Sequence, residues 1–145
     1  PCFCIFSKPP AASLILLQNT VMKKIIKTNA HAFLDYGAAL IMIASPWILL
    51  FQDGTAAKLT FFCSGGLVLL LSFFTNYEGG VVRTIPMSFH PTMDVLLGLF
   101  LILSPWLFGF YSETWLWHVL MGGMSVFAGL FTTHKVPEFL SLKGS

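Results

Sequence analysis

Two related stretches decide the fold: residues 31–51 read HAFLDYGAALIMIASPWILLF, and residues 90–110 read HPTMDVLLGLFLILSPWLFGF. In each stretch an aspartate follows a histidine by four residues, and the triplet Ser-Pro-Trp comes later. The stretches are offset by 59 residues and agree at 8 of 21 positions. Apolar composition alone can match Leu, Ile and Phe, but it does not match His, Asp, Pro and Trp. The chain is therefore an internal duplication.

The duplication continues toward the end of each unit at an offset of 57 residues, which places a two-residue deletion in the second unit's internal connection. The later matches are two glycine pairs and two Phe-Thr pairs: Gly65 and Gly66 with Gly122 and Gly123, and Phe74 and Thr75 with Phe131 and Thr132. Each unit contains two apolar runs. The repeated unit is therefore predicted to be a helical hairpin.

The composition indicates a membrane protein. Of 145 residues, 56% are hydrophobic and 10% are charged, whereas soluble domains carry about 25% charged residues. So apolar a chain is not expected to be disordered. Its formal net charge of +2 is too small to suggest a nucleic-acid partner.

Four apolar runs are predicted to span the membrane, at about residues 32–51, 59–77, 92–110 and 115–133. Each is close to the roughly 17–25 residues that a spanning helix needs, and spanning segments of this kind must be helical to satisfy their backbone. The expected fold is an all-α bundle of four transmembrane helices, built from two hairpins that enter the membrane in the same direction. Inverted repeats, which are common in transporters, are not expected within one subunit.

Basic residues in the connections predict the orientation. One side carries only Lys58, and the other carries Lys23, Lys24, Lys27, Arg83, Lys135 and Lys143. Both termini and the central linker are therefore expected in the cytoplasm, with the bundle in a bacterial inner membrane. The two outer connections are too short to hold a separate domain.

The domain organisation follows from these runs. We expect repeat 1 at residues 31–77, a cytoplasmic linker at 78–89 and repeat 2 at 90–134, with a basic N-terminus at 22–30 and a tail at 135–145. Residues 1–21 are interpreted as a leader upstream of a true start at Met22, with a short cytoplasmic arm as the alternative. Cys63 lies in an apolar run and is expected to be a small buried residue.

The Ser-Pro-Trp triplets predict a bent helix end in each repeat. Pro46 and Pro105 each lack an N–H and crowd the carbonyl four residues earlier, and Ser45 and Ser104 can satisfy that freed carbonyl. The indoles of Trp47 and Trp106 are expected at the outer interface. A hinge or a substrate pocket at the bend is the alternative. The glycine pairs at 65–66 and 122–123 are expected to let helices pack closely.

The two His-x-x-x-Asp motifs, His31 with Asp35 and His90 with Asp94, each place both side chains on one face near the cytoplasmic start of a helix. One interpretation is helix capping, with His90 as N-cap before Pro91, together with a hydrogen-bonded network that fixes how the hairpins meet. Another is a proton-handling site or a divalent metal site. A third is haem ligation by the two histidines.

The repeated Ser-Pro-Trp triplet, the paired His-x-x-x-Asp motifs and the joint between repeats resemble the SPW-repeat family of small bacterial membrane proteins. The joint residues that carry this resemblance are Thr75, Asn76, Tyr77, Glu78, Arg83, Ile85, Pro86 and Met87. The resemblance covers residues 31–134 and implies the fold and the membrane location. It lends no catalytic residues.

No phosphate-binding glycine loop, nucleophile elbow or H-E-x-x-H motif is visible in the sequence, so no cofactor is expected. The leading expectation is a non-enzymatic structural or accessory subunit in the lipid bilayer, in a homo-oligomer or a larger membrane complex. The alternative is a proton-, ion- or metal-linked transport activity centred on His31, Asp35, His90 and Asp94.

Overall fold

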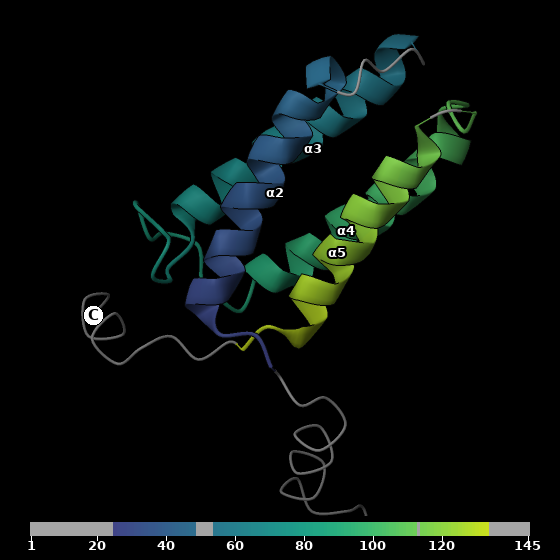
Figure 1. Ribbon diagram of the computed structural model, residues 1–145. Helices are drawn as coiled ribbons and strands as arrows, with labels where there is room; N and C mark the ends of the chain where they lie inside the picture. Colours follow the sequence, from purple (N-terminus) through teal and green to yellow (C-terminus); the bar gives the residue numbers. More distant parts are fainter. Residues whose placement is uncertain (1–24, 49–53, 113, 134–145) are drawn as a thin grey trace, which may run out of the picture.

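The computed structural model describes residues 25–48, 54–112 and 114–133, and this part of the chain is all-helical (Figure 1). Its four helices are α2 (Thr28–Ile48), α3 (Gly54–Phe74), α4 (His90–Leu107) and α5 (Trp115–Phe131). Two isolated bridges are the only extended pairing among these residues. The all-α class is confirmed. The segments predicted at 1–21 and 135–145 lie outside the described residues.

The helices form two hairpins that lie side by side. Helix α2 packs against α3, α4 packs against α5, and α3 contacts α4 (Figure 1). Helix α3 ends three residues before the apolar run does, because the chain turns after Phe74 and Thr75 then bridges to Ile85. Tyr77 therefore belongs to the connection, although the predicted span extended to it.

Backbone hydrogen bonds join the hairpins at one end, and each bond has a counterpart in the other repeat. Ile85 precedes α4 and donates its N–H to the carbonyl of Phe74 at the end of α3, over 2.8 Å. Ile26 precedes α2 and donates to the carbonyl of Phe131 at the end of α5, over 3.1 Å. The segment before each hairpin is thus held by the end of the other hairpin.

Two of the described helices, α3 and α4, are long and apolar enough to cross a membrane, and α5 is a shorter apolar helix. Large apolar side chains point outward from the bundle, among them Phe33, Ile48 and Leu103, which are 85%, 73% and 61% exposed. A surface of this kind is unusual for a soluble protein. The Ser-Pro-Trp indoles of Trp47 and Trp106 also face outward, as expected for interfacial anchors.

The prolines lie near the ends of their helices, and neighbouring serines satisfy the carbonyls that they free. Pro46 cannot donate to the carbonyl of Met42, and Ser45 Oγ donates to that carbonyl over 3.1 Å. In the second repeat Ser104 Oγ donates to the carbonyl of Leu101 over 2.8 Å. The hydrogen bonds expected of the two serines are therefore present.

The first glycine of each pair lies at a helix contact. A Cβ on Gly65 would lie 2.9 Å from a carbonyl oxygen of α2, and a Cβ on Gly122 would lie 2.5 Å from the carbonyl oxygen of Gly98. The packing predicted for Gly66 and Gly123 is not found among the described residues, because both have open space where a Cβ would stand. Adjacent helical residues point about 100° apart, so a contact that buries one leaves the next outside.

Burial differs from expectation at one position of α3, and α5 places a histidine in the interior of the bundle. Cys63 is exposed, so its expected burial is wrong; α3 turns Phe61 and Ser64 inward and Cys63 outward. His118 is fully buried against the rings of Phe61 and Phe110, with centroids 4.3 and 4.7 Å away. These ring contacts join the two hairpins at a distance from the backbone hydrogen bonds of Ile26 and Ile85.

The glycine contacts predict that alanine substitutions at two neighbouring glycines change the free energy of unfolding by different amounts. Gly122→Ala should lower the free energy of unfolding by about 1–3 kcal/mol, because its Cβ must displace the backbone of α4. Gly123→Ala is the matched control and should change it by less than about 0.5 kcal/mol. Thermal unfolding in detergent measures both. Equal effects of the two substitutions would contradict the packing described.

Candidate functional site

Four ionisable side chains from the two hairpins meet at the polar end of the bundle. Helix α2 supplies His31 and Asp35, and α4 supplies His90 and Asp94. One ligand atom from each residue lies within 4.8 Å of the other three. The histidines are 0% exposed and the aspartates 5% and 2% exposed. The sequence predicted the two pairs, and the structure brings them together.

Each histidine lies between both aspartates. Across the hairpins, Nε2 of His31 lies 3.1 Å from Oδ2 of Asp94, and Nε2 of His90 lies 3.0 Å from Oδ2 of Asp35. Within each helix, the corresponding distances are 3.4 Å in α2 and 3.5 Å in α4. The contacts across the hairpins are the shorter ones, so each motif is completed by the other repeat.

The capping interpretation is wrong for these residues. The N-cap of α4 is Phe89, without a side-chain cap, and His90 is the first helical residue. Helix α2 begins at Thr28, and neither helix has an acidic residue in its first turn. The side chains point across to the other hairpin, where buried partners are available. The other part of that interpretation, a hydrogen-bonded network between the hairpins, is present.

Two threonines orient the histidines, and the sequence did not single them out as site residues. Thr75 Oγ1 lies 2.7 Å from Nδ1 of His90, and Thr132 Oγ1 lies 3.0 Å from Nδ1 of His31. Each hydroxyl also donates to the carbonyl four residues earlier, over 2.6 Å. The signal that could have found them is the repeated Phe-Thr pair.

These hydrogen bonds fix which imidazole nitrogen faces the aspartates. Because each threonine proton is given to a backbone carbonyl, its oxygen accepts a hydrogen bond from Nδ1–H of the histidine. The opposite nitrogen, Nε2, then faces two carboxylates. Nitrogen and carboxylate lone pairs at such distances repel one another unless a cation lies between them, whether a proton or a metal ion.

The site is less symmetric than the repeat. Ser72 Oγ donates to Oδ2 of Asp35 over 3.1 Å. The equivalent position in the second repeat is Gly129, where a Cβ would lie 2.5 Å from the carbonyl oxygen of Pro91. Oδ2 of Asp94 is buried and receives no such hydroxyl; its nearest partner is Nε2 of His31, 3.1 Å away. Asp94 is therefore the carboxylate with spare acceptor capacity.

Tyr77 lies over the histidines from the connection between α3 and α4. Its ring centroid is 6.5 Å from that of His31 and 5.7 Å from that of His90. The side chain is fully buried, and burial raises the pKa of its hydroxyl above the ordinary value. Tyr77 therefore stays neutral and covers the site on the side of the connection.

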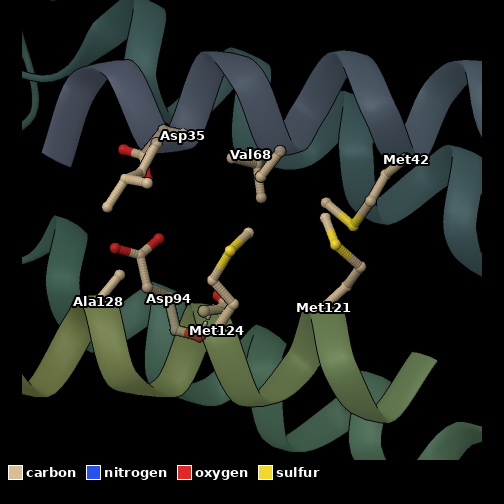
Figure 2. A pocket seen from close by; sticks show the side chains of 10 residues that line it. Asp35, Met42, Val68, Asp94, Met121, Met124 and Ala128 are labelled. Atoms are coloured by element: carbon tan, nitrogen blue, oxygen red, sulfur yellow. Dashed lines mark hydrogen bonds between the residues drawn. The ribbon is translucent and has the colours of Figure 1, made fainter. Parts of the chain in front are cut away.

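A narrow crevice leads from the carboxylates into the bundle. Its volume is about 20 Å³, room for about one water-sized group. Figure 2 shows Asp35 and Asp94 facing one another at one end, with the thioethers of Met42 and Met121 facing one another farther along. Met124 and Val68 line the stretch between these two ends. The crevice thus joins the charged cluster to the apolar middle of the bundle.

Haem ligation and a substrate pocket at the proline bend fit the structure less well than a site at the cluster does. A haem between His31 and His90 would need the space that the carboxylate oxygens occupy, 3.0–3.5 Å from each Nε2. The proline end of α2 borders a groove of about 440 Å³, and its lining has one charged side chain, Lys58. Among the described residues, the ionisable side chains that gather within ligand distance are the four of the cluster.

The network predicts a large cost for removing one member. His90→Ala should lower the free energy of unfolding by about 3–5 kcal/mol, because it leaves a buried carboxylate and a buried hydroxyl without their partner. Phe89→Ala, at the neighbouring exposed position, should cost less than about 1 kcal/mol. Denaturation in mild detergent measures both. Similar values for the two would contradict the network.

Comparison with known proteins identifies the family of the chain. A family model described as the SPW repeat domain matches residues 29–132, which include both hairpins and all four cluster residues. No curated protein and no solved structure matches the chain. The family match and the apolar helices together indicate a small membrane protein and assign it no activity. The chain belongs to the SPW repeat family.

Proposed function

We propose that this protein is a non-enzymatic membrane protein that binds a cation between its two hairpins and passes it along the bundle. The observation that carries the proposal is the convergence of His31, Asp35, His90 and Asp94 from two helices. Ionisable residues within a membrane bundle are rare and commonly mark functional sites such as ion pathways or proton relays. A purely structural network would not need two acids facing each other.

The proposed membrane arrangement is four spans in a bacterial inner membrane, with both hairpins in the same direction and both termini in the cytoplasm. Loop charges support this orientation. The matched hydrogen bonds from Ile26 to α5 and from Ile85 to α3 support two parallel repeats. The cluster then lies near the cytoplasmic face, with the crevice directed toward the membrane interior.

Charge and access support a cation at this place. Two carboxylates buried away from water are costly without a counter-charge, and an acidic pair attracts a cation and repels an anion. The crevice at Asp35 and Asp94 has room for about one water-sized group beside the carboxylates. The described residues that line it include no lysine or arginine.

A second candidate is an accessory subunit in a larger membrane assembly or a homo-oligomer. The open space at Gly66 and Gly123 favours it, because small exposed residues let another helix approach closely in lipid. The large apolar side chains around the bundle contact lipid or such a partner. This candidate predicts that loss of the two acids changes stability and leaves ion movement unaffected.

Ion flux separates the two candidates. The double substitution Asp35→Asn with Asp94→Asn should reduce cation-dependent flux into liposomes at least tenfold, because it removes both negative charges while preserving shape. Glu78→Gln, an acid in the connection outside the cluster, should leave flux close to that of the unmodified chain. Dyes sensitive to protons and to divalent ions report the flux.

Two outcomes decide the proposal. Flux in the unmodified chain that is lost only with the cluster acids supports a cation pathway. Equal flux in all three proteins, with a native mass that is a multiple of the chain mass or that includes another protein, would contradict the pathway and favour the accessory subunit.

A further inference from the structure

This inference rests on the proposed cation function. We propose that the cation is a single divalent metal ion of the zinc type, held by four side chains. The ligand atoms are Nε2 of His31 and His90 and one carboxylate oxygen each of Asp35 and Asp94. Each hairpin supplies one nitrogen and one oxygen. The metal therefore joins the two repeats.

The donor set and its spacing point to a tetrahedral ion. Zinc takes imidazole nitrogen and carboxylate oxygen at about 2.0–2.2 Å, so neighbouring ligand atoms in a tetrahedron lie about 3.3–3.6 Å apart. The four nitrogen-to-oxygen distances here are 3.0, 3.1, 3.4 and 3.5 Å, close to these values. All four ligand atoms lie within 4.8 Å of one another, so a tetrahedral ion would draw the more widely spaced atoms closer together. Magnesium and calcium prefer six or more oxygen ligands, and two imidazoles in a four-ligand set disfavour both.

The surroundings of the histidines are those of metal ligands. A metal-bound histidine usually donates its other N–H to an oxygen, which fixes the tautomer and the ring orientation. Thr132 and Thr75 accept these hydrogen bonds from Nδ1 of His31 and His90. Because the threonines are held in turn by backbone carbonyls, both Nε2 atoms are directed at the centre of the cluster before a metal arrives.

Two of the four proposed ligand atoms have capacity for a further bond within the cluster. Nε2 of His31 and Oδ2 of Asp94 are buried and lie 3.1 Å apart, and neither atom makes a further hydrogen bond with a described residue. A cation between them, a proton or a metal ion, would satisfy both atoms. Two carboxylates also balance the charge of one divalent ion with two neutral imidazoles. The site is therefore complete in ligand number and in charge.

Metal titration of the full chain in detergent tests the inference. After treatment with a chelator, the protein should bind one Zn²⁺ per chain by calorimetry. Cobalt provides a second reading that needs no substitution, because tetrahedral Co²⁺ absorbs visible light far more strongly than octahedral Co²⁺. A metal-free protein that binds no Zn²⁺, or that shows only the weak octahedral spectrum with Co²⁺, would overturn the inference.

Substitutions locate the metal. Asp94→Asn should weaken Zn²⁺ binding at least 100-fold, and Thr75→Val should weaken it about 10–100-fold through the histidine that it orients. Thr75→Ser keeps the hydroxyl and should restore binding. His118→Gln, a buried histidine outside the cluster, should bind Zn²⁺ like the unmodified chain. Loss of binding in His118→Gln with retention in Asp94→Asn would place the metal elsewhere and overturn the assignment.

The metal inference and the proposed function fail in different ways. Flux that depends on Asp35 and Asp94 without Zn²⁺ binding would overturn the metal and leave a proton pathway. Tight Zn²⁺ binding without flux would support the metal and contradict transport, leaving the ion as a clamp between hairpins.

Discussion

The reciprocal contact of two buried histidines with two buried aspartates is the interaction on which the rest of this structure depends. A carboxylate away from water is costly unless an opposite charge or a donor is close. Asp35 and Asp94 each find their nearest such partner, a histidine, where α2 and α4 meet. This requirement holds the hairpins together at one end, and the backbone crossings at Ile26 and Ile85 and the ring of Tyr77 surround the same point.

The duplication explains why the site has four members. One repeat alone supplies one histidine and one aspartate, which is half of a metal-binding set. Two copies facing each other supply two of each, and the threonine that orients each histidine comes from the opposite repeat. The exceptions to this symmetry, Ser72 against Gly129, fall beside the aspartates. The two acids therefore differ in their environment, although their motif is repeated.

The sequence predicted the features that depend on local patterns. Apolar runs indicated the helices, and the prolines indicated the serine hydrogen bonds, because both follow from residues close in the chain. It could not predict the convergence of the four side chains, which depends on how far α2 and α4 are rotated. The rotations of α3 and α5 likewise leave Cys63 exposed and Gly66 and Gly123 beside open space. The capping interpretation was wrong because the sequence pattern locates the start of a helix but does not show which side chains of the other hairpin lie opposite it.

The central claim is that the two motifs form one site, and a double-mutant cycle tests it most directly. The free energy of unfolding in detergent would be measured for the unmodified chain, His31→Ala, Asp94→Ala and the double variant, whose members lie on different hairpins. The account predicts a coupling energy of at least about 1 kcal/mol between the two substitutions. Effects that add to within about 0.5 kcal/mol would contradict it, because independent sites behave in that way.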